Sequence, residues 1–304
     1  KKAVQLASHD NLQMRIIGMG ILRHLSVNTR IKRPIVQEGA LIPMFKAVEH
    51  IEQDLDLLRQ TAALFSNLAE NNENQITMVK DQCLPYVIHL SRVDSVEIEQ
   101  DISKTFALLT SNVENQNNVF GYDEIFSILY LINKSKEENC LRDGLIALGN
   151  LAITGKNQIM IVKLGGLSIA KRMLESEFET VKRYMCRLLY RLAAHQQLQE
   201  QMLIPNVIEL LNELLRGDSN LIRKYVLMIY CNLSSNEKNR VALAQCGAIA
   251  PVIFNLQHPE EIISRYAAMT ITNLATEASN QEVVSKLGGI NELIILASKD
   301  GFEG

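Results

Sequence analysis

The sequence predicts an all-α protein in which one helical unit repeats along the chain. The composition suits helices, because only 15 of the 304 residues are Gly, 6 are Pro and 5% are aromatic. Sheet-rich proteins use more aromatic and β-branched residues. A short motif recurs four times: Asn-Leu, with a second Asn seven residues after the first. Before each copy, apolar residues follow one another at spacings of three and four, as a buried helical face requires.

The motif gives each unit a reference position, the anchor, which is the first Asn. Three weaker copies of the motif fit between and before the four clear ones. Successive anchors lie 39 to 44 residues apart, a period typical of α-solenoids. The seven anchors are Asn67, Asn150, Asn232 and Asn273 in the clear copies, and His24, Ser111 and Arg191 in the weaker ones.

Each unit is predicted to contain three helices in a constant order. After the anchor comes a polar loop, then a first helix of about two turns, which ends at Gly because a left-handed C-cap favours Gly. A second helix follows, such as residues 248–256. The third helix, such as residues 222–233, carries the next anchor near its end.

This unit resembles the armadillo repeat. The family's marks are a Gly-Gly or Gly-Ala turn between the first and second helices and an Asn-Leu pair near the end of the third. The resemblance implies a right-handed α-solenoid of about seven armadillo repeats, forming a single domain over residues 1–304. More loosely, the chain is similar to vacuolar-tethering and armadillo-repeats-only scaffold proteins. The turns are Gly39-Ala40, Gly165-Gly166, Gly247-Ala248 and Gly288-Gly289.

Two units and both ends depart from the regular pattern. The linkers after Ser111 and after Arg191 are short, so we expect stunted first helices there. Residues 1–7 match a second helix, and residues 290–298 form another with no third helix after it. We therefore expect partial repeats at both ends, with the array continuing beyond them or being capped by another element.

The residue after the anchor is predicted to belong to the core. It is Leu in six of the seven copies, and stacked repeats bury a continuous apolar core of this kind. The six are Leu25, Leu68, Leu151, Leu192, Leu233 and Leu274.

The anchor and the residues four and seven positions before it share one face of the third helix. The resemblance implies that this face lines a concave groove, in which the anchor Asn hydrogen-bonds the backbone of an extended peptide. The last three copies carry Tyr and Met on this face, residue types common at binding surfaces. An alternative is that the tyrosines pack between neighbouring third helices. The candidate groove residues are Asn67, Asn150, Tyr184, Arg187, Arg191, Tyr225, Met228, Asn232, Tyr266, Met269 and Asn273.

Eight positions before the anchor, five copies carry a basic residue. A cation near a helix N-terminus opposes the helix dipole and so needs an explanation. Local salt bridges to acidic residues a few positions upstream are the favoured explanation, and an acidic partner lying along the groove is the alternative. This basic ladder consists of Arg59, Arg142, Arg183, Lys224 and Arg265.

Several function classes are not expected. Nuclear-import adaptors of the family place Trp four residues before the anchor, and this chain has no Trp. The formal net charge of -3 does not suit nucleic-acid binding, and no apolar run is long enough to cross a membrane. Five cysteines without a C-x-x-C pair indicate reduced thiols in a cytoplasmic protein rather than disulfides or zinc. No catalytic motif occurs, so we expect no enzymatic activity, no cofactor and no metal.

The sequence therefore predicts a scaffold or adaptor that binds an extended or helical segment of a partner protein in its groove. One alternative is a regulatory armadillo domain of a larger protein, controlled by a small ligand or by intramolecular contacts. Another is a structural stack within a larger assembly. The expected location is the cytoplasm, including the cytosolic face of an organelle membrane if an N-terminal lipid anchor precedes Lys1.

Overall fold

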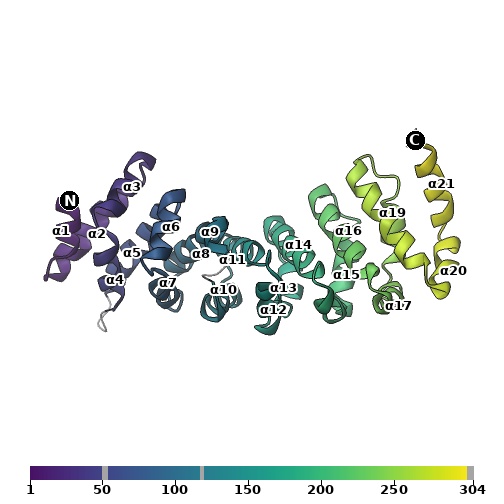
Figure 1. The fold of residues 1–304 in the computed structure, drawn as a ribbon, viewed down its shortest axis with the longest axis horizontal. Coiled ribbons are helices and arrows are strands. Elements are labelled where there is room, and N and C mark those ends of the chain that lie inside the picture. Colours follow the sequence, from purple (N-terminus) through teal and green to yellow (C-terminus); the bar gives the residue numbers. More distant parts are fainter. Residues whose placement is uncertain (50–53, 117–119, 300–304) are drawn as a thin grey trace. The chain divides into compact units, whose positions relative to one another are not determined.

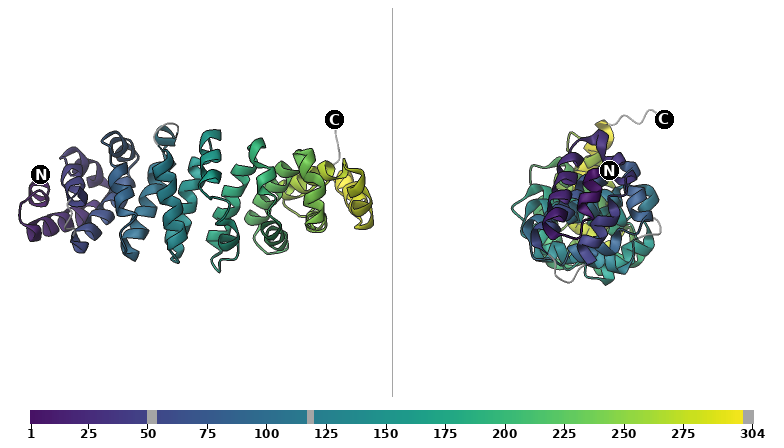
Figure 2. Two further views of the ribbon diagram at one scale, coloured as in Figure 1. Left: turned by 90° about the horizontal axis from the view of Figure 1, so that it is seen from below. Right: turned by 90° about the vertical axis from the view of Figure 1, so that its left-hand side faces the viewer.

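The computed structural model describes residues 1–49, 54–116 and 120–299, and in these ranges it contains 21 α-helices, two 3-10 helices and no strand. The helices pack in chain order, as in a helical-repeat solenoid (Figure 1). The chain divides into two compact units, residues 1–164 (unit 1) and 165–304 (unit 2). In each unit the helices follow one another in the order of the sequence (Figure 2).

The predicted third helices are the longest helices of most repeats, with 14 to 16 residues each. Within a unit, consecutive third helices pack against each other, as α5 does against α2 and α8. They are α2 (Leu12–Ser26), α5 (Leu55–Ala69), α8 (Val96–Ser111) and α11 (Glu138–Leu151) in unit 1, and α14 (Glu179–Ala193), α16 (Asn220–Ser235) and α19 (Glu261–Ala275) in unit 2.

Eight helices correspond to the predicted second helix. Seven of them precede a third helix, and the eighth, α21, follows the last of the predicted first helices. They are α1 (Lys2–Ala7), α4 (Leu41–Glu49), α7 (Leu84–Leu90), α10 (Tyr122–Lys134), α13 (Ala170–Leu174), α15 (Pro205–Leu214), α18 (Ile249–Phe254) and α21 (Gly289–Lys299).

The first helices follow the anchors, and five of them have nine residues. The two irregular units differ as the short linkers predict: one has a helix of four residues, and the other has two 3-10 turns. These elements are α3 (Thr29–Gln37), α6 (Asn72–Lys80), α9 (Val113–Gln116), α12 (Gly155–Lys163), η1 (Gln196–Leu198), η2 (Glu200–Met202), α17 (Glu237–Gln245) and α20 (Ala278–Lys286).

The polar loop after the anchor begins the first helix by capping it. In four copies, the side chain four residues after the anchor accepts a hydrogen bond from a backbone N–H of the first turn, which satisfies a donor that the helix leaves unpaired. These caps are Asn28, Asn71, Thr154 and Asn236.

The turn between first and second helices has a left-handed residue fifteen positions after the anchor. Four copies use Gly there, with φ between 77° and 95°. The remaining regular copy uses Gln82, at φ 62°, which the sequence motif did not reveal. A residue with a Cβ is strained in this region, whereas Gly is not.

The structure corrects one anchor. In the four copies with an Asn anchor, the residue seven positions after the anchor is also Asn. The amides of Asn74, Asn239 and Asn280 donate to the carbonyl of the Leu after the anchor, as Asn74 does to Leu68 O at 3.1 Å. In α8 the equivalent bond joins Asn115 to Leu109 O at 3.0 Å. The anchor of this copy is therefore Leu108 and not Ser111, which is exposed. The short α9 linker and the absence of an Asn-Leu pair produced the wrong alignment.

The corrected register explains the core. The Leu after the anchor is 0% exposed in six copies, but Leu25 is 42% exposed, so its predicted core position is wrong. Leu25 lies on α2, the first of the third helices, which packs against only one other third helix, α5. The buried six are Leu68, Leu109, Leu151, Leu192, Leu233 and Leu274.

Candidate functional site

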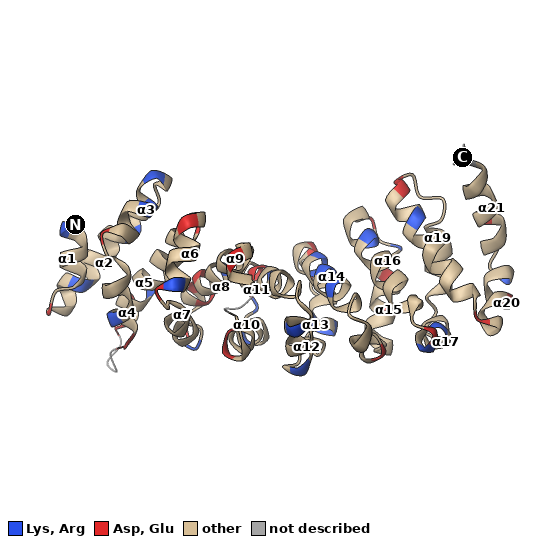
Figure 3. Cartoon of the chain, in the orientation of Figure 1, with Lys and Arg blue, Asp and Glu red and all other residues tan. Residues whose placement is uncertain are grey.

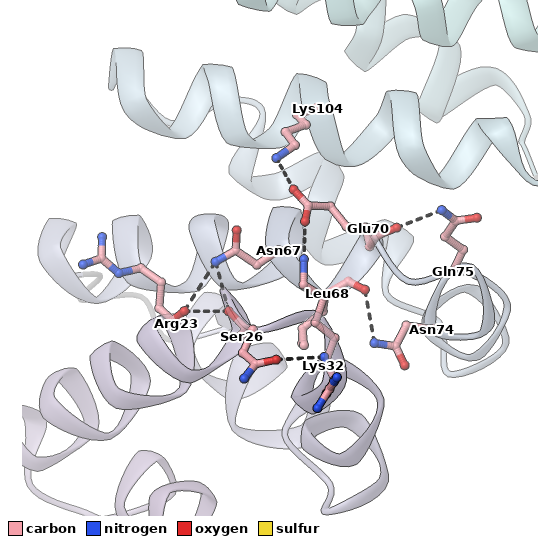
Figure 4. Close-up of polar contacts among 12 residues, drawn as sticks. Arg23, Ser26, Lys32, Asn67, Leu68, Glu70, Asn74, Gln75 and Lys104 are labelled. Atoms are coloured by element: carbon pink, nitrogen blue, oxygen red, sulfur yellow. Dashed lines mark hydrogen bonds and ion pairs between the residues drawn. The ribbon is translucent and has the colours of Figure 1, made fainter.

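The anchor Asn residues of unit 1 bond the preceding third helix. The amide nitrogen of Asn67 donates to Ser26 Oγ at 2.9 Å and to Arg23 O at 3.4 Å (Figure 4). Asn150 donates to the hydroxyl of Thr110 and to Ala107 O, both at 3.4 Å, and is only 8% exposed. Both N–H groups of each amide thus hold neighbouring repeats together.

Unit 2 contains one anchor of the same kind and one that differs. Asn273 donates to Ser234 Oγ at 3.1 Å and to Cys231 O at 3.4 Å. Among the residues that the structure describes, the side chain of Asn232 makes no hydrogen bond, and it is partly exposed. The hydroxyl acceptor lies two positions after the preceding anchor, and for Asn232 that position holds Ala193. The amide of Asn232 therefore lacks the hydroxyl partner that the other Asn anchors have.

Unit 1 also carries an ion-pair network that joins two neighbouring repeats (Figure 4). Lys32 of α3, whose side chain is 3% exposed, pairs with Glu70, and Lys104 of α8 pairs with the same carboxylate at 2.5 Å. Partial burial opposes ionisation of Glu70, but hydrogen bonds from Lys104 and Lys32 outweigh it and hold its pKa below the ordinary value. The groove-side cation Lys104 is thereby already neutralised within the protein.

In unit 2 the predicted groove residues of α14 and α16 come together around a shallow hollow of about 290 Å³, a volume at the low end for a small-molecule pocket. Leu221 completes the lining. The lining residues are Arg183, Tyr184, Arg187, Leu221 and Tyr225.

Two aromatic contacts order this surface. The guanidinium of Arg183 lies over the ring of Tyr184, 4.8 Å from its centroid, a favourable cation–π arrangement. The ring of Tyr225 packs against Tyr190, with centroids 6.2 Å apart. Tyr190 was not predicted, because it lies off the face defined by the anchor spacing.

The predicted tyrosines both pack and line the surface. Tyr184, Tyr225 and Tyr266 are all partly exposed, so contacts between helices do not bury them. Met228 is partly exposed and Met269 is 46% exposed. Each tyrosine ring is therefore partly buried, in line with the alternative that the tyrosines pack between helices, and partly accessible to solvent.

Arg191, a weak anchor, stands beside Arg187 one helical turn away on α14. Burial and the charge of Arg187 lower the pKa of Arg191, while the phenols of Tyr225 and Tyr190 act in the opposite direction. Positive charge is thus crowded at the end of α14 that faces the Tyr225 ring.

The basic ladder divides between the two units. In unit 1, Arg59 pairs with Asp56 at 3.4 Å and with Glu97 at 3.6 Å, which fits the local-pair explanation. Arg142 pairs at 2.9 Å with Asp143, which stands seven positions before the anchor Asn150.

In unit 2 the ladder residues behave differently. Arg183 and Arg265 lie over the adjacent rings of Tyr184 and Tyr266, at 4.8 and 5.8 Å from the centroids. Within the described ranges, Arg183, Lys224 and Arg265 form no ion pair. The upstream acidic residues expected to pair with them do not do so.

The described residues include candidate metal ligands and cysteine thiols. They contain no group of three or more His, Cys, Asp or Glu residues placed to hold a metal ion. Burial raises the pKa of the Cys186 thiol to about 12 and also raises that of Cys83, so these thiols are poor nucleophiles at neutral pH. No helix in the described part of the chain is long and apolar enough to span a membrane.

Comparison with known proteins supports the fold alone. No protein-family model and no curated protein sequence matches the chain. A crystal structure of an engineered protein from the Northeast Structural Genomics Consortium matches with a TM-score of 0.60, covering 99% of this chain and 94% of that chain at 14% sequence identity. The likeness identifies an all-helical, repeat-like fold.

Proposed function

We propose that this protein is an armadillo-type scaffold that binds an extended segment of a partner protein on the third helices of unit 2. The observation that carries the proposal is Asn232. It is the one Asn anchor whose side chain makes no hydrogen bond within the described residues, and it lies on the same helix face as Tyr225. An Asn amide both donates and accepts, so it can bond a peptide backbone without regard to sequence.

The order of helices supports the proposed armadillo type of repeat. Five copies contain a first helix of nine residues, a left-handed turn and a second helix, and in four of them a longer third helix follows within the described residues. A three-helix unit with this turn and an Asn-Leu pair supports the armadillo assignment over two-helix repeats. Binding on an array of this kind uses a surface built from several repeats at once.

The test is selection of peptides from a random library displayed on phage. Wild-type protein should enrich peptides that the double variant Tyr225→Ala/Asn232→Ala does not bind. Thermal unfolding followed by circular dichroism verifies that the variant is folded. The control variant Gln60→Ala/Asn67→Ala changes the same two repeat positions in unit 1, and it should retain the selected peptides. No enrichment by the wild type, or equal enrichment by the Tyr225/Asn232 variant, would refute the proposed function.

A further inference from the structure

The face made by α14 and α16 is strongly basic. Helix α14 carries four cations and one acidic residue, Glu179, in its first turn, and Figure 3 shows Lys and Arg gathered on this helix. Helix α16 adds Arg223 and Lys224 without any acidic residue. The four cations of α14 are Lys182, Arg183, Arg187 and Arg191.

Part of this charge is not neutralised within the described protein. Arg223 is engaged, since it donates to Leu215 O and Asn220 Oδ1 and lies 3.0 Å from His258 Nε2. Arg183 and Lys224 form no ion pair there. The guanidinium of Arg183 lies over the Tyr184 ring without an ion pair, and a guanidinium can donate two parallel hydrogen bonds to a carboxylate.

The corresponding face of unit 1 has a different character. On helix α8, Asp101 stands seven positions before the anchor Leu108, and Glu70 compensates the charge of Lys104. Asp143, at the same repeat position of α11 as Tyr225 on α16, pairs with Arg142. The cations on this face of unit 1 are thus already compensated, and an anionic ligand is favoured more by unit 2 than by unit 1.

We propose that the α14–α16 face binds an extended segment rich in Asp and Glu. This inference rests on the proposed function. The Asn232 amide bonds the backbone of the segment, and carboxylates reach Arg183 and Lys224. Neighbouring third helices lie about 8–10 Å apart, which equals about three residues of extended chain. Acidic side chains a few residues apart in the segment therefore meet cations on successive helices.

The experiment uses three fluorescein-labelled peptides of about ten residues, long enough to cross two helices. They alternate Ser with Glu, with Gln or with Lys, and binding is measured by fluorescence anisotropy. The Glu peptide should bind about tenfold more tightly than the Gln peptide, with an affinity that falls as salt is added. The Lys peptide should not bind. Equal binding of the Glu and Gln peptides, or of the Lys peptide, would overturn the inference.

Matched variants locate the site. Arg183→Gln/Lys224→Gln should weaken binding of the Glu peptide by about tenfold. Arg59→Gln/Arg142→Gln removes the same charge from unit 1 and should change the affinity by less than about twofold. Salt screens charges that do not contact the peptide, so a change in net charge alone has little effect on binding. If both variants weaken binding equally, the carboxylates are not held at this face and the inference fails.

Two outcomes separate the inference from the proposed function. If the selected library peptides depend on Tyr225 and Asn232 but are not acidic, the function holds and the acidic specificity is wrong. If the Glu peptide binds equally to Tyr225→Ala/Asn232→Ala, it only adsorbs to the basic helix, and the inference is wrong. A phosphoserine peptide that binds while the Glu peptide does not would also overturn it, in favour of phosphate.

Discussion

Units 1 and 2 present the same repeat positions and use them differently. In unit 1 both Asn anchors bond the preceding third helix, and both ladder arginines pair with carboxylates. In unit 2, Asn232 makes no side-chain hydrogen bond within the described residues, and Arg183 stacks on Tyr184 instead of pairing with an acid. The repeat thus supplies polar groups at fixed places, and neighbouring side chains decide whether those groups stabilise the array or face a ligand.

The deciding neighbour of an anchor Asn is the residue two positions after the preceding anchor. A hydroxyl stands there wherever the next Asn is bonded, as Ser26, Thr110 and Ser234 show. Ala193 stands there before Asn232. One small side chain therefore distinguishes a structural Asn from one that is available for binding.

The largest effect is expected where the two units agree, at the Leu after the anchor. Leu109→Ala in unit 1 and Leu233→Ala in unit 2 should each lower the free energy of unfolding by about 2–5 kcal/mol, because both side chains are fully buried. Urea denaturation measures the change. Asn112 would be the residue after the anchor if Ser111 were the anchor. Asn112→Ala should lower the free energy of unfolding much less than Leu109→Ala does. An equal loss would show that Ser111 is the anchor after all.

A second prediction concerns the ion-pair network that only unit 1 contains. Glu70→Gln leaves Lys32 buried without an anion and should destabilise the protein by about 2 kcal/mol. Most other copies have Gln at the repeat position of Lys32. This Gln donates a hydrogen bond to the carbonyl of the second residue after the anchor, as Gln75 does to Ala69 O at 2.8 Å. Adding Lys32→Gln should therefore restore much of the loss, and failure of this rescue would show that the network does not act as a pair.

The network also gives a pH dependence. Because the pKa of Glu70 is lowered in the folded protein, its ionised form favours folding above the ordinary glutamate pKa. This stabilisation is lost as the pH falls through the lowered value. The difference in stability between wild type and Glu70→Gln, measured by denaturation at a series of pH values, should therefore shrink in acid. A difference that stays constant down to strongly acidic pH would contradict this origin.

A third prediction tests the comparison directly. Asn67→Ala and Asn273→Ala each remove hydrogen bonds between helices and should cost about 1 kcal/mol in urea denaturation. Asn232→Ala should leave stability nearly unchanged and weaken peptide binding. Ala193→Ser should give Asn232 a hydroxyl partner and thereby also weaken binding, whereas unchanged binding by Ala193→Ser would contradict the role assigned to this position.

Much of this arrangement could be predicted from the sequence. The period, the Gly turns and the stunted α9 and η1–η2 elements follow from local spacing and from conformational preferences. The position of the anchor in α8 could not be predicted, because Leu108 stands where the clear copies have Asn. Only the hydrogen bonds of Asn115 identify Leu108 as the anchor. The hydrogen bond of Asn67 could not be predicted from the sequence of its own repeat, because its partner, Ser26, lies on the third helix of the preceding repeat.

The smallest effect concerns the turn between first and second helices. Unit 1 holds Gln82 in the left-handed conformation, where unit 2 uses Gly165, Gly247 and Gly288. Gln82→Gly should stabilise the protein by about 0.5–1 kcal/mol, because relief of backbone strain exceeds the greater flexibility of Gly in the unfolded chain. Gly288→Ala should destabilise it by about as much, since an added Cβ there meets no atom within 4 Å and strain is the only change. Thermal and urea unfolding of both variants measure the difference, and a loss of stability in Gln82→Gly would show that the Gln82 side chain stabilises the turn in a way that Gly cannot.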